Sequence, residues 1–254
     1  MEDRIKGKSF DINYNDTLSF FNDRGSDAPL KHKYNYVLFQ DEHPELAIER
    51  DRYEKDKILG LVEFKEDEWV LDVGCGVGRW GEEILSRNMH YVGLDYSETL
   101  LKVAEDNLKD KKDKCTLIQG AAQNIVNSLE QAGVNTAFDK VFINGVLMYL
   151  NDADLSDCLE DVSKVIDKEN CTIYIKETVA TSERLTLNKF YSQDLKHDYT
   201  AIYRTTQEYA ESLTRIFVDK FGFEIIVSED LFSEELKNRK ETKDYFFILS
   251  KRAR

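Results

Sequence analysis

The feature that most constrains this chain is an apolar run that leads directly into three alternate glycines. Trp69–Val73 is rich in large and β-branched side chains, which is typical of a strand buried in a parallel sheet. Gly74, Gly76 and Gly78 follow, and a helical pattern begins near Arg79. Glycine allows a positive φ and lets the backbone come close to a ligand, and the amides that open a helix attract polar or anionic groups. The stretch therefore predicts a strand, a tight turn and a helix, either as a plain turn or as a ligand-binding loop.

The spacing of these glycines and the strand that follows narrow the choice of ligand. Gly-x-Gly-x-Gly is not the dinucleotide fingerprint Gly-x-Gly-x-x-Gly, and the sequence contains no Gly-x-x-x-x-Gly-Lys-Ser/Thr phosphate loop. Tyr91–Asp95 reads as a second strand that closes on an acid, a little over twenty positions after Asp72. An acid in that place can bind the two ribose hydroxyls of a nucleoside. The pattern favours a nucleoside-containing cofactor, and the glycine spacing disfavours a nicotinamide-dependent oxidoreductase.

Two segments carry a family resemblance. VLDVGCGVGRW (70–80) and YVGLDYSETLL (91–101) resemble the first and second signature motifs of class I S-adenosylmethionine-dependent methyltransferases of the small-molecule type. The resemblance covers about residue 58 to the end of the chain, and it implies S-adenosylmethionine as cofactor and S-adenosylhomocysteine as product. The cofactor-binding residues that it implies lie at strand ends: Asp72, Gly74, Cys75, Gly76, Trp80, Asp95, Tyr96, Ala122, Gln123 and Asn144. The family often carries an acid at the end of the third strand, where this chain has Ala121 and Ala122.

Strand and helix patterns alternate along the chain after the glycine loop. The further expected strands cover residues 115–119, 138–144, 171–177, 223–227 and 245–250. Helices are expected from the N-cap Ser97 and over 152–165. Such alternation gives parallel strands joined by right-handed crossovers, with helices on both faces. The last two strands would close the sheet as an antiparallel hairpin. The predicted fold is α/β, with a doubly wound, seven-stranded, mostly parallel sheet of the Rossmann-like class I methyltransferase type.

The predicted organisation is a single methyltransferase domain over residues 1–254. Residues 1–57 are expected to form an N-terminal helical clasp on the body of the domain or a lid over the cofactor, and residues 58–254 the Rossmann-like core. Turn signals fall at residues 24–29 and 41–44. Within the core, an insertion at 178–204 follows the fifth strand and shows no obvious strand pattern. We expect this insertion and the N-terminal segment to decide which molecule is methylated.

Composition excludes several classes of partner. Lys and Arg number 35 against 49 Asp and Glu, a net charge of −14, so the chain should repel nucleic acid and anionic membranes and act on a small molecule. No apolar run approaches the roughly 18 residues of a membrane span, and the start lacks a signal-peptide core, so a cytoplasmic location is expected. Four scattered cysteines and four histidines predict neither a metal site nor a disulfide framework. The oligomeric state is left open.

Three residues near expected strand ends are candidates for a general base. Methyl transfer from a sulfonium depends mainly on alignment, and a base helps only if the acceptor is an amine or a hydroxyl. The candidates are Tyr149, Glu177 and His197, with Glu177 best placed at the end of the fifth strand. Each has a structural alternative: a core aromatic for Tyr149, a surface ion pair for Glu177 and a solvated loop position for His197. A phosphate or carboxylate acceptor needs no base.

Arginines in this acidic chain suggest the charge of the acceptor. Arg50 and Arg52 precede the glycine loop, and Arg184 and Arg204 lie in the insertion, close to Tyr203. Arginine binds carboxylates and phosphates bidentately, so Arg184, Tyr203 and Arg204 are predicted to bind a small anionic acceptor. The alternative is that each arginine pairs with a surface acid. Segments such as EHPELAIERDRYEKDKI and YTAIYRT also resemble small-molecule methyltransferases of bacterial surface-polysaccharide pathways, which implies a sugar or a phosphorylated intermediate as acceptor.

A non-catalytic protein is the main alternative from another class. A chain that only binds S-adenosylmethionine, as a sensor or as the silent partner of an active subunit, would carry the same glycine loop and the same Asp95. Formation of S-adenosylhomocysteine in the presence of an acceptor separates the two hypotheses.

Overall fold

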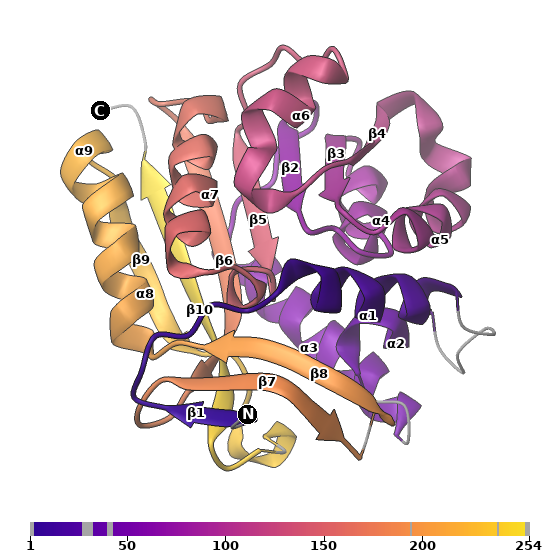
Figure 1. Cartoon of the computed structure of the whole chain (residues 1–254). Helices are drawn as coiled ribbons and strands as arrows, with labels where there is room; N and C mark the ends of the chain where they lie inside the picture. Colours follow the sequence, from indigo (N-terminus) through magenta and orange to yellow (C-terminus); the bar gives the residue numbers. More distant parts are fainter. Residues whose placement is uncertain (1–2, 27–32, 40–42, 194, 238, 252–254) are drawn as a thin grey trace.

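The computed structural model describes residues 3–26, 33–39, 43–193, 195–237 and 239–251. Its main element is a seven-stranded sheet in the order β4-β3-β2-β5-β6-β10-β9 (Figure 1). The strands are β2 (Trp69–Val73), β3 (His90–Asp95), β4 (Cys115–Gln119), β5 (Lys140–Asn144), β6 (Cys171–Ala180), β9 (Glu224–Asp230) and β10 (Thr242–Lys251). Of the turn signals predicted at 24–29 and 41–44, residues 27–29 and 41–42 lie outside the described residues. Residues 24–26 are the last of helix α1 (Tyr14–Ser26), which corrects that part of the prediction, and Pro44 begins helix α3 (Pro44–Leu61).

The direction of the strands defines the fold type. β2 to β6 are parallel, whereas β10 lies antiparallel between β6 and β9. The chain moves outward from β2 through β3 to β4 and then returns to the other side of β2 with β5, so the strand order reverses there. In sheets of this kind ligands bind at the carboxyl ends of the strands on both sides of that point. The predicted fold class and its closing antiparallel pair are confirmed.

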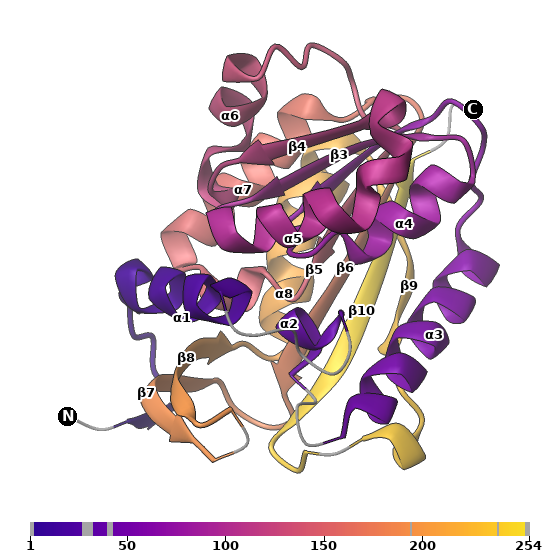
Figure 2. The ribbon, with the colours of Figure 1, turned by 90° about the vertical axis from the view of Figure 1, so that its right-hand side faces the viewer.

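Helices cover both faces of the sheet (Figure 2). On one face, α3 (Pro44–Leu61), α4 (Arg79–Ser86) and α5 (Glu98–Leu108) pack through Ile58, Trp80, Ile84 and Leu101. On the other lie α6 (Ile125–Gln131), α7 (Asp152–Val165), α8 (Thr206–Leu213) and, after a π turn, α9 (Asp219–Phe221). Among the described residues, every helix is too short or too polar to cross a membrane.

Local patterns predicted several boundaries correctly. β2, β4 and α7 have the predicted limits, and α4 begins at Arg79. The hydroxyl of Ser97 accepts a hydrogen bond from the Leu100 N–H at 3.3 Å, as expected of an N-cap. Helix α6 was not predicted, and β6 continues three residues beyond the predicted strand, to Ala180.

A second, three-stranded sheet corrects the prediction for residues 178–204. This segment forms an antiparallel pair, β7 (Leu185–Ser192) and β8 (His197–Tyr203), and β1 (Arg4–Lys6) adds to the edge of β7. The alternation of apolar and polar residues that marks a half-buried strand is weak here, because the start of β7 and most of β8 are buried on both faces. With α1 (Tyr14–Ser26) and α2 (Asn35–Leu38), this small sheet lies across the end of the main sheet to which β5 points (Figure 1).

Candidate functional site

The loop between β2 and α4 is fixed against β3 by its own backbone. The N–H groups of Gly74 and Cys75 both donate to the Leu94 carbonyl, at 2.7 and 3.0 Å. Gly74 and Gly76 have φ angles of +69° and +53°, in the left-handed region that favours glycine. A Cβ atom on Gly74 would also overlap the side chain of Val146. Glycine at position 74 is therefore required by conformation and by space, and it leaves bare backbone facing a cavity.

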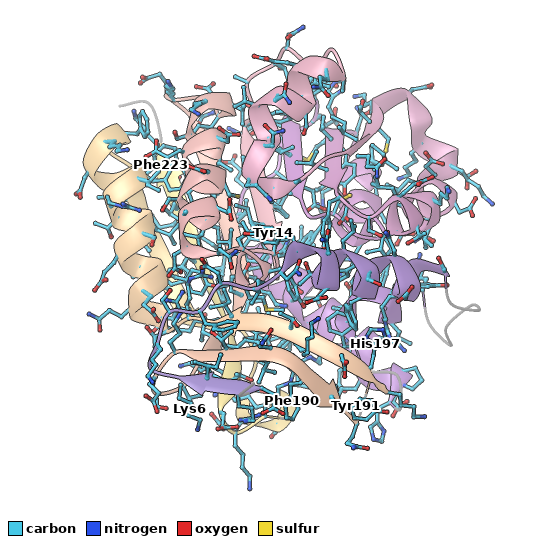
Figure 3. The ribbon with its side chains drawn as sticks, in the orientation of Figure 1. Lys6, Tyr14, Phe190, Tyr191, His197 and Phe223 are labelled. Atoms are coloured by element: carbon cyan, nitrogen blue, oxygen red, sulfur yellow. The ribbon has the colours of Figure 1, made fainter. Side chains whose placement is uncertain are left out.

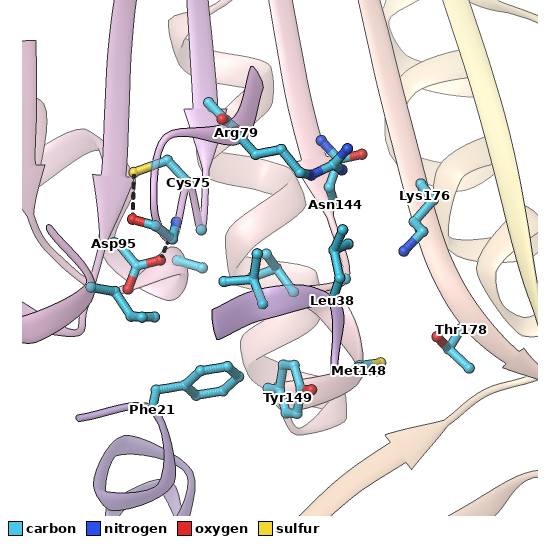
Figure 4. Close-up of a pocket in the computed structure, with 18 of the residues that line it drawn as sticks. Phe21, Leu38, Cys75, Arg79, Asp95, Asn144, Met148, Tyr149, Lys176 and Thr178 are labelled. Carbon is cyan, nitrogen blue, oxygen red and sulfur yellow. Dashed lines mark hydrogen bonds between the residues drawn. The ribbon is translucent and has the colours of Figure 1, made fainter. Parts of the chain in front are cut away.

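That cavity runs along the carboxyl ends of β2 to β6 (Figure 4). All ten predicted cofactor-binding residues line it: Asp72, Gly74, Cys75, Gly76, Trp80, Asp95, Tyr96, Ala122, Gln123 and Asn144. The fold thus brings together residues that lie as far apart in sequence as Asp72 and Asn144. Leu100, Gly120 and Ala121 complete the wall at the ends of β3 and β4.

Asp95, the last residue of β3, is held in place by two amides. Its Oδ2 accepts a hydrogen bond from the Gly76 N–H at 2.8 Å, and its Oδ1 accepts one from the Ser97 N–H at 2.9 Å. Burial raises the pKa of Asp95 to about 6, although these amides work in the opposite direction. The carboxylate is ionised at neutral pH and is fixed beside the glycine loop, where it can accept hydrogen bonds from vicinal hydroxyls.

Asp72 lies on β2, the strand that pairs with β3, within the apolar run. Its Oδ2 accepts a hydrogen bond from the Tyr91 hydroxyl at 2.8 Å. Burial raises its pKa to about 7 in spite of this hydrogen bond. Asp95 gives the glycine-loop end of the cavity a negative charge at neutral pH, and Asp72 adds to it in its ionised form, which suits a cofactor that carries positive charge.

Asn144 ends β5 at the centre of the cavity. Both its Nδ2 and Oδ1 are buried, and neither has a hydrogen-bond partner among the described residues. Buried amides without a partner are rare in proteins, because leaving their donors and acceptors unused costs about 1–3 kcal/mol. The Asn144 side chain is therefore free to bind a polar group of a ligand from the same side as the glycine loop.

The N-terminal segment covers the cavity. Phe21 from α1 and Val37, Leu38 and Phe39 from α2 and its end line the side opposite the sheet. A Cβ atom on Gly76 would lie 2.7 Å from Cγ1 of Val37, so α2 sits directly on the glycine loop. The position agrees with the lid alternative, although that role itself stays a prediction.

The wall away from the glycine loop is cationic. Arg50 from α3, Lys176 from β6 and Arg239 from the segment before β10 line it, together with Asp244. Figure 4 shows Lys176 on the side of the cavity opposite Asp95. Asp244 Oδ2 lies 2.6 Å from Nη2 of Arg50, and its Oδ1 lies 3.2 Å from Nζ of Lys176. Burial acts to raise the pKa of Asp244, but Lys176, Arg50 and Arg239 outweigh it and lower the pKa to about 2.

Of the three candidate bases, Tyr149 alone lines the cavity. Its hydroxyl lies 2.6 Å from that of Tyr199, and burial raises its pKa well above the ordinary value. Glu177 lies behind the wall, where its carboxylate accepts the N–H groups of residues 146, 147 and 148 at 2.9, 2.9 and 3.1 Å. His197 is placed at the outer end of β8, 3.6 Å from Asp23 (Figure 3). In this structure Glu177 fixes a turn, and His197 does not face the cavity.

None of the three predicted acceptor-binding residues lines the cavity. Arg204 is buried, and it donates to the carbonyls of Leu147 and Leu150 at 2.9 and 2.7 Å and to Asp152 at 2.7 Å. Arg184 pairs with the same Asp152. Tyr203 is buried in β8 and does not line the cavity itself, but it lies near Tyr199 and Arg239, which do. This is a correction: Arg204 is engaged by Asp152 of α7 and by the turn before it, and Arg184 by Asp152 and, at 3.7 Å, by Glu208 of α8, as in the ion-pair alternative.

Several cavity residues were missed by sequence reasoning. Lys176, Arg239 and Asp244 belong to the last third of the chain, where the sequence singled out other residues as candidates. Arg50 was noted as an arginine near the site, whereas Arg52 beside it is exposed and pairs with Asp56 at 3.6 Å. The available signal was helical spacing: Arg50 and Glu54 are four residues apart and therefore share one face of α3, whereas residue 52 faces elsewhere.

The glycine-loop end of the cavity fits S-adenosylmethionine. The bare backbone of Gly74 lines the cavity, Asp95 is in place for a ribose, and the unpartnered amide of Asn144 faces the same space. Among the described residues, no group of His, Cys, Asp and Glu could hold a metal ion.

Comparisons with known proteins agree with this assignment. Residues 70–169 match the family model described as methyltransferase domain. A probable cobalt-precorrin-6B C(15)-methyltransferase (decarboxylating) from Methanocaldococcus jannaschii is 25% identical over 147 residues, which are 57% of this chain and 71% of that protein. Phosphoethanolamine N-methyltransferase 1 from Zea mays is 22% identical over 182 residues, which are 71% of this chain and 35% of that protein. The chain thus spans about a third of the length of the maize protein.

Solved structures share the fold. Haemonchus contortus phosphoethanolamine N-methyltransferase 1, in complex with phosphoethanolamine and S-adenosylhomocysteine, superposes with a TM-score of 0.68 at 15% identity. The match covers 94% of this chain and 49% of that one. The glycopeptide N-methyltransferase MtfA with S-adenosylmethionine gives a TM-score of 0.55 at 17% identity, covering 80% of this chain and 93% of that one.

Proposed function

Because this chain is a class I S-adenosylmethionine-dependent methyltransferase, we propose that it transfers the methyl group to an oxygen or nitrogen of a small, anionic metabolite. One observation carries the choice of acceptor: Arg50, Lys176 and Arg239 line the same cavity as the glycine loop, in a chain with a net charge of −14. The cofactor would occupy the acidic end of the cavity and the acceptor the cationic end.

The cofactor end supplies four kinds of contact in this proposal. Asp95 would accept hydrogen bonds from the ribose, and Tyr96 and Gln123 would surround the adenine. The bare backbone at Gly74 would lie against the amino-acid tail, which the Asn144 amide could also reach. When bound, S-adenosylmethionine supplies a methyl group on a sulfonium, which is already strongly electrophilic.

The residues of the acceptor end support alignment more than base catalysis. Tyr149 and Tyr199 have pKa values raised well above the ordinary value, first by burial, so both stay protonated near neutral pH. Asp244 is held by Arg50 and Lys176 and has a pKa of about 2, too low for an effective base. We therefore propose that these residues bind and orient the acceptor. The attacking atom of the acceptor would already be nucleophilic when it binds, so that no base of the protein has to remove a proton from it.

The two covering segments are part of the same proposal. Residues 1–57 would close over the cofactor, since Phe21 and Val37 line the cavity. The segment 178–204 would contribute to acceptor recognition through Tyr199 of β8, which lies on the acceptor side beside Tyr149. This assigns the substrate contact to a tyrosine of the small sheet and not to Arg184 or Arg204.

A panel of acceptors tests the proposal by formation of S-adenosylhomocysteine. Sugar phosphates and nucleotide-linked sugars represent the surface-polysaccharide expectation, and phosphoethanolamine represents the relatives with that name. Each is paired with its neutral counterpart lacking the anionic group. We expect product with one or more anions and none with the matched neutral compounds.

The same assay separates the alternatives. Product with neutral acceptors only would overturn the anionic assignment. A protein that binds S-adenosylmethionine but forms no product with the panel or with a metabolite extract would favour the non-catalytic alternative.

Titration of Asp95 gives a pH prediction. With a pKa of about 6 in the free protein, Asp95 loses its charge and one acceptor position as the pH falls below that value. Because the ionised form binds the ribose, we expect the affinity for S-adenosylmethionine to fall below pH 6 by up to about tenfold per pH unit. Calorimetry between pH 5 and pH 8 measures it.

Two variants give the controls for Asp95. Asp95→Asn should bind S-adenosylmethionine about 1.5–3 kcal/mol more weakly at pH 7.5, the usual contribution of a hydrogen bond to a charged group. It should also lose the part of the pH dependence centred near 6. Glu98→Gln changes a nearby exposed acid that pairs with Lys102 at 2.7 Å, and it should keep the wild-type profile. An unchanged profile in Asp95→Asn would exclude Asp95 as the titrating group.

A further inference from the structure

We propose that Arg50, Lys176 and Arg239 form a binding subsite for a phosphate group, so that the methyl acceptor is a phosphate monoester. The inference rests on the proposed function and narrows its acceptor class. The three cations come from separate elements: α3, β6 and the segment between residues 236 and 242. They line one wall of the same cavity that the glycine loop lines at its other end.

Asp244 organises two of the three cations. Its two oxygens contact Arg50 at 2.6 Å and Lys176 at 3.2 Å, and Oδ1 also accepts the Thr178 hydroxyl at 3.2 Å. Arg50 is further fixed by the Leu236 carbonyl at 2.7 Å. The side chains of Arg50, Lys176 and Asp244 are 10%, 13% and 14% exposed, so these charges are largely removed from water.

The charges of this wall do not balance. Three cations of this wall face one carboxylate, Asp244, which leaves two positive charges in excess on the wall itself. The acids Asp72 and Asp95 also line the cavity, but at its glycine-loop end. Glu54 also lies nearby, but its Oε2 pairs with Nη2 of Arg79 at 2.9 Å, so the charges of these two residues compensate each other. A phosphate monoester carries close to two negative charges at neutral pH, because its second pKa is near 6. A carboxylate would compensate only half of the excess.

Arg239 is the cation available to a ligand. It is exposed and lines the cavity, near Tyr199, Tyr203 and Asp244. Among the described residues, no hydrogen bond and no ion pair to its guanidinium is present, in contrast to Arg50. A planar guanidinium can grip two phosphate oxygens at once. The Tyr149 and Tyr199 hydroxyls line the same cavity and can donate to a third oxygen.

Binding to the S-adenosylhomocysteine-saturated protein tests the subsite directly. Glycerol 3-phosphate, glycerate and glycerol differ only in the group offered to the wall, and inorganic phosphate probes the subsite alone. We expect glycerol 3-phosphate to bind at least tenfold more tightly than glycerate, with glycerol undetectable in calorimetry. Higher salt should weaken the phosphate binding, as expected of partly screened ion contacts.

Variants identify the residue responsible. Arg239→Gln should weaken glycerol 3-phosphate binding at least tenfold. The affinity of Arg239→Lys should lie between those of Arg239→Gln and wild type, because lysine keeps the positive charge but lacks the planar guanidinium that can bind two oxygens. Arg52→Gln removes an exposed arginine of α3, the helix that carries Arg50, and should change nothing. The affinity for S-adenosylhomocysteine should stay within twofold of wild type in all three variants, which shows that they are folded.

Several results would overturn the inference. They are equal binding of glycerol 3-phosphate by wild type and Arg239→Gln, tighter binding of glycerate than of the phosphate, or no phosphate binding at all. Methyl transfer to an anion without a phosphate group would also refute the subsite and leave the methyltransferase proposal intact. Failure to form S-adenosylhomocysteine with any acceptor, despite tight phosphate binding, would instead count against the proposed function.

Discussion

Gly74→Ala is expected to abolish S-adenosylmethionine binding in calorimetry, with a loss of more than a hundredfold in affinity. Residue 74 has a φ of +69°, where alanine is disfavoured by about 1–2 kcal/mol. Its new Cβ atom would overlap the Val146 side chain, and because both residues line the cavity, the shift that relieves the overlap would change the wall that faces the cofactor. Displacing the loop would also disturb the amides that donate to Leu94 and Asp95.

Two further variants separate these causes. Gly133→Ala has the same backbone conformation, with a φ of +72°, but nothing lies within 4 Å of its added Cβ. It should lose a little stability and no cofactor affinity. The double variant Gly74→Ala/Val146→Ala relieves the overlap with Val146 and should recover stability without recovering binding. If that folded double variant bound S-adenosylmethionine like wild type, the space at Gly74 would not belong to the cofactor.

The residues that line the cavity at the glycine loop and the strands of the main sheet could be predicted from sequence because their signals are local. Glycines next to a buried strand and an acid at the end of the next strand are short-range patterns, and β2, β4 and α7 follow from continuous apolar periodicity. The hairpin β7–β8 was missed because its edge partner β1 lies about 180 residues away and its burial comes from α1 and the main sheet. The Leu185–Ser192 segment carries no regular alternation of its own.

The cationic wall of the cavity depends on tertiary contacts that no short sequence pattern contains. Arg204 and Arg50 looked alike in sequence, as arginines in segments near the site. What separates them is Asp152 at the start of α7, which engages Arg204 together with two backbone carbonyls, whereas the helical face of α3 turns Arg50 toward the cavity. The role of Asp244 could not be predicted from the sequence, because it depends on the pairing of β10 with β6, which places Asp244 opposite Thr178.

Glu54→Leu is expected to destabilise the fold by about 3–5 kcal/mol, the range for breaking a buried ion pair from one side. The Glu54 side chain is 2% exposed and pairs with Arg79, which is 7% exposed, at 2.9 Å. It also accepts hydrogen bonds from the Tyr174 hydroxyl at 2.9 Å and from Nε1 of Trp80 at 3.3 Å. Glu54 thereby joins α3 to the helix that follows the glycine loop and to β6. Denaturant unfolding monitored by circular dichroism measures the loss.

A double-variant cycle shows whether the loss comes from an unpaired charge. Leucine leaves Arg79 buried with Asp51 alone, which must also serve Lys55 at 3.0 Å. Removing the second charge as well, in Glu54→Leu/Arg79→Met, leaves the Asp51–Lys55 pair intact and should restore most of the lost stability, because buried ion pairs can be replaced by apolar groups at little net loss. Glu49→Leu, the same change at an exposed position of α3, should stay within about 0.5 kcal/mol of wild type. If the double variant were as unstable as the sum of its two single variants, the charge pairing would not be what holds α3 to the glycine-loop helix.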